Sequence, residues 1–199
     1  MITIKQLLEM ASNLGNPISD MNDQEYRKKL YNHYSDAPKI KTINAHISLH
    51  KSENNNKTEI STLNDKTKEA LHHAIFLNHK KSNTFPFDHQ EQSLVERKQH
   101  EGSKDLQKGH ATNITYEHFK NSKLPLRTSD NQTTAGHGMW RTLVHKALDD
   151  GHHVYHWDGA KLHKTTKENA NEHLNAYFNY GHGFRNKHMI LSNAELGDK

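Results

Sequence analysis

The clearest hydrophobic pattern in the chain lies between Gly138 and Asp150, where apolar residues recur at helical spacing. One face of this segment is apolar and consists of Trp140, Leu143, Val144, Ala147 and Leu148. Gly151 follows the last of these residues, which is typical of a helix end. The pattern therefore predicts an amphipathic core helix from about Gly138 to Asp150.

Several other segments show a helical period. The predicted helices cover Thr3–Leu14, a stretch from Ser19 or Asp20 to Tyr34, Asp65–Asn78, Gln92–Gln99 and Thr165–Tyr180. The first two are short, carry apolar faces that can pack together, and end before Pro38. They predict an N-terminal helical hairpin.

Alternation of apolar and polar residues is typical of strands and occurs in shorter stretches. The predicted strands cover Lys39–His50, Lys57–Leu63, Ala111–Phe119, an extended segment Lys123–Thr128, and Lys187–Ser192. A β-hairpin is predicted around Asp158-Gly159, a dipeptide suited to a type I′ turn. Residues 80–109 are the most polar part of the chain and predict a long loop.

These elements predict an α+β fold with a small mixed or antiparallel sheet packed with helices. The expected organisation is a helical hairpin at residues 1–37, followed by a single α+β domain at residues 38–199. The polar loop near residues 80–109 belongs to the second part.

Composition narrows the classes of protein that fit. Hydrophobic residues make up 32% of the 199 residues, and 27 basic against 23 acidic residues give a formal charge of +4. This balance is mildly basic, short of a dedicated nucleic-acid binder. The absence of cysteine excludes disulfides, zinc–thiolate sites and thiol nucleophiles. No signal peptide or membrane span is visible, so we expect a soluble protein, cytoplasmic or exported without a visible signal peptide.

The glycine-rich start of the predicted core helix suggests a ligand site. Gly136, His137, Gly138 and Met139 lie where backbone N–H groups have no partner within a helix, and such groups attract anions. Downstream, the stretch from Asn171 to Phe184 carries an apolar helix followed by a Gly-Phe pair. Together the two segments resemble the GNAT acetyltransferases, whose glycine-rich turn presents N–H groups to the pyrophosphate of coenzyme A.

This resemblance implies an acyl-CoA-dependent N-acyltransferase with acetyl-CoA as cofactor. Residues Gly136–Met139 would hold the pyrophosphate, and a tyrosine, Tyr177 or Tyr180, would act as general acid near the thioester. The resemblance also implies a meander of strands before the turn, and parallel, splayed strands on either side of the helix. Arg127 lies in a polar cluster just before the turn and is the candidate substrate-binding residue.

A second resemblance centres on His110. Lys108-Gly109-His110, followed by Asn131, Gln132 and the helix that contains Trp140, is similar to the layout of ββα-metal nucleases. There a histidine is the general base and one Mg²⁺ stabilises the leaving phosphate, with His137 in the ligand position here. His46-Ile47-Ser48 and His110-Ala111-Thr112 also resemble the paired motifs of 2H phosphoesterases. His110 is thus the general base of an alternative hypothesis, a metal-dependent nuclease or phosphodiesterase.

The 19 histidines raise the question of metal binding. His72, His73 and His79 share one predicted helix, and His152, His153 and His156 share one predicted strand. Strand alternation points His153 away from the other two, and no His-Glu-x-x-His motif occurs. No metal site is assigned on this basis. A third hypothesis is a non-catalytic effector or accessory protein that binds a protein partner through its polar loops.

Overall fold

The computed structural model describes residues 23–82, 84–97, 109–129, 134–178 and 187–197 of the chain. These residues form two compact units, each treated separately below. Unit 1 contains residues 23–53, 59–74 and 95–97, and unit 2 contains the rest. Within the described part, no helix is long and apolar enough to cross a membrane.

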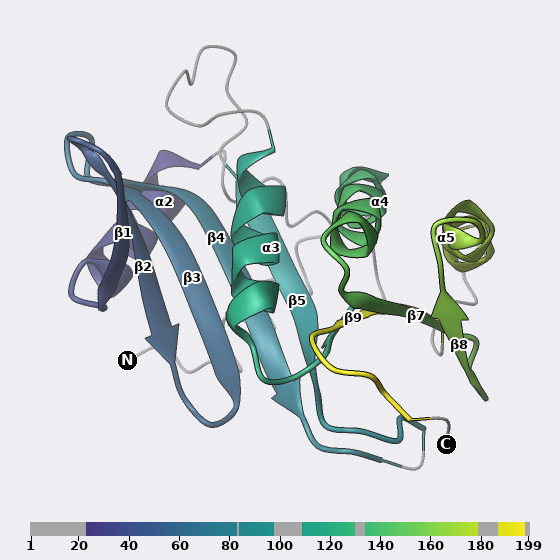
Figure 1. The fold of residues 1–199 in the computed structure, drawn as a ribbon. Helices are drawn as coiled ribbons and strands as arrows, with labels where there is room; N and C mark the ends of the chain where they lie inside the picture. Colours follow the sequence, from purple (N-terminus) through teal and green to yellow (C-terminus); the bar gives the residue numbers. More distant parts are fainter. Residues whose placement is uncertain (1–22, 83, 98–108, 130–133, 179–186, 198–199) are drawn as a thin grey trace. The chain divides into compact units, whose positions relative to one another are not determined.

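Figure 1 labels the helices and strands of the described residues. Their bounds are α2 Gln24–Tyr34, β1 Lys39–Asn44, β2 Ile47–Glu53, β3 Lys57–Asn64, β4 Glu69–His79, β5 His89–Arg97, α3 His110–Asn121, β6 Leu126–Arg127, α4 Thr134–Asp149, β7 His153–Trp157, β8 Leu162–Thr165, α5 Ala170–Phe178 and β9 His188–Ser192.

The strands form a mixed sheet in the order β1-β2-β3-β4-β5-β6-β9-β7-β8. Sheet and helices agree with the predicted α+β class. The expectation of a small sheet is wrong, because nine strands take part. The first five strands are neighbours in chain order, whereas β9, the last strand, lies between β6 and β7.

In unit 1, α2 packs against β2. Asp23 caps the helix by accepting a hydrogen bond from the Glu25 N–H at 2.8 Å. Tyr31 and Tyr34 enter a small core with strand residues of the same unit. The predicted helix at residues 19–34 is therefore confirmed from Gln24 onward, but as a layer on the sheet. The predicted partner helix Thr3–Leu14 lies outside the described residues.

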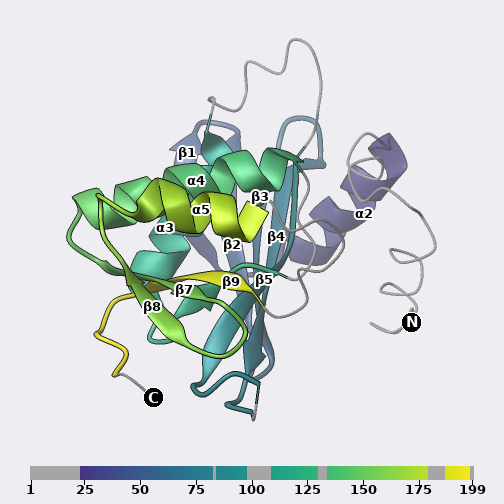
Figure 2. The same cartoon turned by 90° about the vertical axis from the view of Figure 1, so that its right-hand side faces the viewer.

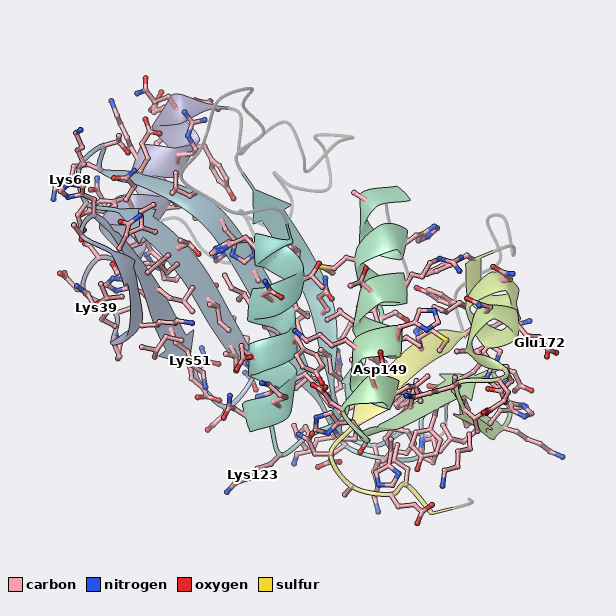
Figure 3. All side chains as sticks on the ribbon, turned by 45° about the horizontal axis from the view of Figure 1, so that its top comes forward. Lys39, Lys51, Lys68, Lys123, Asp149 and Glu172 are labelled. Atoms are coloured by element: carbon pink, nitrogen blue, oxygen red, sulfur yellow. The ribbon has the colours of Figure 1, made fainter. Side chains whose placement is uncertain are left out.

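The interface between α2 and the strands of unit 1 is polar as well as apolar. Arg27 and Glu69 form an ion pair at 3.2 Å with both side chains 5% exposed. Tyr34 donates a hydrogen bond to Glu59 at 2.8 Å. Burial, followed by the charge of Glu59, raises the pKa of Tyr34. On the outside of the unit, Lys39, Lys51 and Lys68 project from the strands and their turns (Figure 3).

The predicted strand Lys39–His50 is two strands in the structure. The Asn44 side chain accepts hydrogen bonds from the N–H groups of His46 and Ile47, both at 2.9 Å. This Asx turn reverses the chain, so β1 and β2 pair antiparallel with Asn44 opposite Ile47. The apolar alternation therefore continues through a turn instead of marking one strand.

Three predicted elements have the wrong type. The predicted helix Asp65–Asn78 overlaps the strand β4, the predicted helix Gln92–Gln99 overlaps the strand β5, and the predicted strand Ala111–Phe119 lies within the helix α3. Residues 69–74 of β4 are all buried, on both faces of the strand. A strand buried on both faces loses its two-residue alternation and reads as an apolar run, which a helix also produces.

In unit 2, the helices α3, α4 and α5 lie on one face of the strands (Figures 1 and 2). The apolar face predicted for α4 is confirmed, because Trp140, Leu143, Val144 and Ala147 are fully buried. The last predicted strand is confirmed as β9. It pairs antiparallel with both β6 and β7.

The predicted hairpin after α4 is confirmed as β7 and β8. Its turn is not type I′, because Gly159 has φ 103° while Ala160 is not among the residues with positive φ. Thr165 ends β8 and does not cap a helix. α5 begins at Ala170, inside the predicted helix, and it buries Ala170, Leu174 and Tyr177.

Candidate functional site

The helix α3 connects two strands that pair in parallel, β5 and β6. Gln90 lies opposite Leu126, and Glu91 lies opposite Arg127. In such a unit the helix returns the chain, so its N-terminus faces the carboxyl ends of the strands. Ligands of parallel sheets bind at that end.

The parallel pairing covers only these two residue pairs and ends well before β5 does. The next residue after β6, Thr128, donates its N–H to the Met189 carbonyl at 3.0 Å and so stays with β9. On β5, Gln92 is the first residue beyond the pairing. It is buried, and its Oε1 atom has no hydrogen-bond partner. A buried acceptor without a donor is costly, so this position suits a ligand N–H group.

The N-terminus of α3 is built around Gly109. This residue has φ 83° and ψ 7°, a left-handed conformation that favours glycine, and it provides no capping side chain. The first helical bond joins the Asn113 N–H to the Gly109 carbonyl at 2.9 Å. The first turn carries no acidic residue. The positive end of the helix dipole is therefore not neutralised by a carboxylate of its own first turn.

Arg127 occupies the two-residue strand β6 and is held by side chains of the neighbouring strands. Its Nη2 donates to Glu91 Oε2 at 2.6 Å, and its Nη1 lies 2.7 Å from His188 Nε2. His188 Nδ1 donates to the Thr128 carbonyl at 3.1 Å, which leaves Nε2 as the acceptor. Burial, followed by the charge of Arg127, lowers the pKa of His188 to about 3. Arg127 thus links the side chains of Glu91 on β5 and His188 on β9. Its binding of a substrate stays a prediction.

Two histidines that the sequence did not single out as a pair, His79 and His89, lie next to Glu91 and Arg127. The rings of His79 and His89 stack with their centroids 5.1 Å apart, and His79 Nε2 lies 3.3 Å from Glu91 Oε2. His89 Nδ1 donates to the Phe87 carbonyl at 3.0 Å. Its Nε2 is buried without a hydrogen-bond partner, and burial lowers its pKa to about 4. His89 is therefore a neutral imidazole with a free lone pair.

The residues predicted to form a glycine-rich turn are helical. Gly136, His137, Gly138 and Met139 lie inside α4, which begins at Thr134. The Gly138 carbonyl accepts a hydrogen bond from Thr142 Oγ1 at 3.1 Å, four residues along the helix. His137 stacks on Phe178 with ring centroids 4.2 Å apart. The prediction of a turn was wrong, because α4 begins at Thr134 and includes both glycines. Binding of coenzyme A by these residues stays a prediction.

The two predicted catalytic residues lie on different helices. Tyr177 of α5 is buried, and its hydroxyl donates to the Ser129 carbonyl, just beyond β6, at 3.3 Å. His110 is the first residue of α3. Their catalytic roles stay predictions. Tyr180, Asn131 and Gln132 lie outside the described residues.

The histidines singled out in the sequence do not form the expected sets. His72, His73 and His79 lie on a strand, β4, and not on a helix. In the described part of the chain, no three histidine, aspartate or glutamate side chains are arranged to hold a metal ion.

Three comparisons with known proteins complete the description of this site. The chain matches no protein-family model, no curated protein and no solved structure.

Proposed function

We propose that the protein is an acyl-CoA-dependent N-acyltransferase whose coenzyme A pyrophosphate binds at the N-terminus of α3. The observation that carries the proposal is the parallel pair β5 and β6 joined by α3. The resemblance stated above implies a meander, then a helix flanked by parallel strands that splay apart. The strands β1 to β5, the helix α3 and the strand β6 follow in this order along the chain. The proposed helix is thus α3, whereas the sequence resemblance pointed to α4.

The N-terminus of α3 has the electrostatics that a pyrophosphate requires. Gly109 keeps side-chain atoms away from the N–H groups of the first turn, and no carboxylate of that turn competes for them. The helix dipole adds the equivalent of roughly half a positive charge there. In the proposed complex, these N–H groups donate to the phosphate oxygens.

The end of the β5–β6 pairing suits the rest of the cofactor. The pantetheine arm of coenzyme A carries amide N–H groups, and Gln92 Oε1 is a buried acceptor without a donor. Tyr177 reaches Ser129, two residues beyond the last residue of β6. In the proposed reaction, the substrate amine attacks the thioester carbonyl and the C–S bond breaks. The phenol proton of Tyr177 then goes to the departing thiolate, and the proton that the attacking nitrogen loses restores the phenol.

Titration calorimetry with acetyl-CoA tests the site. In the variant Ala111→Glu, a carboxylate enters the first turn of α3, where it favours the helix but repels a pyrophosphate. The matched control is Ala135→Glu, which places the same charge on an exposed residue of the first turn of α4. We expect Ala111→Glu to weaken binding at least tenfold and Ala135→Glu to leave it unchanged.

If Ala135→Glu weakens binding and Ala111→Glu leaves it unchanged, the pyrophosphate binds at the site predicted from the sequence, Gly136–Met139. No binding by the unmodified protein at millimolar acetyl-CoA would exclude the function. Release of coenzyme A thiol in the presence of amines, lost in Tyr177→Phe, tests the catalytic step. Circular dichroism of each variant checks that the fold is retained.

A further inference from the structure

α3 and β5 each carry a buried polar side chain that has no hydrogen-bond partner in the described part of the chain. Thr115 of α3 is 0% exposed, and Gln92 of β5 is 4% exposed. The atoms concerned are Thr115 Oγ1, which can donate and accept, and Gln92 Oε1, which can only accept. Burial of a polar atom without a partner costs free energy, so folded proteins keep few such atoms and each calls for an explanation.

Two hydrogen bonds fix the place where α3 crosses β5. His118 Nε2 donates to Gln90 Oε1 at 2.9 Å, and Ser122 Oγ, just after the helix, donates to the same oxygen at 3.0 Å. The C-terminal part of α3 therefore packs near the start of β5. Because α3 carries the chain back from the end of β5 to the start of β6, it runs opposite to β5, and its N-terminus lies toward the end of that strand (Figure 1).

This crossing places Thr115 and Gln92 next to each other. Thr115 precedes His118 by three residues, so the two lie on the same face of the helix, about 4.5 Å apart along its axis. Gln92 follows Gln90 by two residues, so these two lie on the same face of the strand, about 6.6 Å apart. Both displacements lead from the His118–Gln90 bond toward the N-terminus of α3. Thr115 on the helix therefore faces Gln92 on the strand.

The two side chains lie within reach of a ligand bound at the N-terminus of α3. Glu91 and Arg127 are the last residues paired between β5 and β6, so Gln92 is the first residue of β5 beyond this pairing. Gly109 precedes Thr115 by six residues, about 9 Å along the helix axis. A linear ligand with its anionic group at Gly109 reaches Thr115 and Gln92 with the arm that follows.

We propose that Gln92 and Thr115 bind one amide of the pantetheine arm, so that the protein recognises its acyl donor through this arm. The inference rests on the proposed function and adds to it the group by which the donor is selected. The amide N–H donates to Gln92 Oε1, and the Thr115 hydroxyl donates to the amide carbonyl. Because the N–H and C=O groups of a trans amide point in opposite directions, an amide between strand and helix meets one partner on each side. Binding then satisfies both buried atoms.

Titration calorimetry with the full chain and acetyl-CoA tests these contacts. We expect Thr115→Val and Gln92→Leu each to weaken binding about tenfold, because each leaves one polar atom of the bound amide without a partner. The nucleotide half of the cofactor, ADP with a 3′-phosphate, contains no amide of this kind. It should bind to both variants as tightly as to the unmodified protein.

The melting temperature without ligand gives a second readout. Thr115→Val replaces a buried hydroxyl that lacks a partner with a methyl group, so it should raise the melting temperature while it weakens binding. The matched control is Thr165→Val, because Thr165 is also buried but its Oγ1 lies 2.8 Å from His173 Nδ1. This control should lower the melting temperature and leave the affinity for acetyl-CoA unchanged.

The possible failures of the two proposals can be told apart. If acetyl-CoA binds to Thr115→Val and Gln92→Leu as tightly as to the unmodified protein, recognition of the amide is overturned and the proposed function stands. If neither acetyl-CoA nor pantetheine binds to the unmodified protein at millimolar concentration, both proposals are overturned. Circular dichroism checks that each variant is folded.

Discussion

At the scale of single residues, Asx turns set the lengths of the strands in the hairpins. Asn44, Asn54 and Asn64 follow one another at ten-residue intervals, and each side chain accepts hydrogen bonds from the N–H groups two and three residues later. Asp158 does the same in the β7–β8 turn. The turn chemistry thus fixes the register of the hairpins together with the apolar pattern.

This role predicts the effect of one substitution. In Asn54→Ala, the N–H groups of Asn56 and Lys57 lose their shared acceptor, which holds them at 2.9 and 3.0 Å. The free energy of unfolding should fall by about 1 kcal/mol, as for the loss of an exposed turn or cap acceptor. Urea denaturation measures the difference. Asn55→Ala, in the same turn, is the control, and equal losses in both variants would contradict the role of the side chain.

At the scale of elements, the sequence predicts the type of α2, α4, α5, β3, β9 and the β7–β8 hairpin. These include α4, which buries one face, and also β3 and β9, which bury nearly all their residues. β4 and β5 were assigned to helices or loop. β4 buries successive residues, and β5 alternates polar side chains such as Gln90 and Gln92 that are buried by the fold. Burial of polar residues depends on neighbours far along the chain, which no local pattern contains.

The helical conformation of the α4 glycines leads to a prediction. A Cβ added at Gly138 meets no atom within 4 Å, and the residue lies in the helix interior. Gly138→Ala should therefore raise the free energy of unfolding by about 1 kcal/mol, the difference in helix propensity. Chemical denaturation or the melting temperature measures it.

Gly151 provides the opposing control. A Cβ there also meets open space, but φ is 79°, so Gly151→Ala should destabilise by about 1 kcal/mol through backbone strain alone. Destabilisation by Gly138→Ala would mean that Gly138 needs a conformation that alanine disfavours. The predicted turn would then regain support.

At the scale of the whole molecule, the candidate site depends on topology, which the sequence reveals only in part. The sequence drew attention to Gly136 and Gly138 because they precede the most regular helix. The parallel pairing that singles out α3 joins Gln90 and Glu91 to Leu126 and Arg127, about thirty-six residues apart along the chain. The residues of β5 and β6 themselves do not indicate which strand each pairs with, or that the pairing is parallel.

The buried histidines predict the acid stability of the protein. His89, His156 and His188 have pKa values lowered to about 4, about 4 and about 3, chiefly by burial. In the unfolded chain they titrate near pH 6.5, so below this pH the unfolded state binds more protons than the folded state. The free energy of unfolding is therefore highest above about pH 6.5. It falls progressively as the pH decreases toward 4, because only the unfolded chain takes up these protons.

Urea denaturation at pH 7, 6 and 5 should therefore show a falling free energy of unfolding. The expected loss is on the order of 1–2 kcal/mol for each buried histidine between pH 7 and pH 5. His89→Gln should make the dependence shallower, because it removes one titrating group. A free energy that stays constant over this range would show that the pKa values of the three rings are not lowered in the folded protein.

The position of β9 has a consequence for biosynthesis. This strand pairs with β6 on one side and β7 on the other, yet it is made after both. A nascent chain that has emerged only as far as α5 exposes the edges of two strands that have nothing between them. Such edges pair readily with other chains. Unit 2 is thus expected to complete its sheet only after translation has passed residue 192, and translation arrest before that point should yield aggregating fragments.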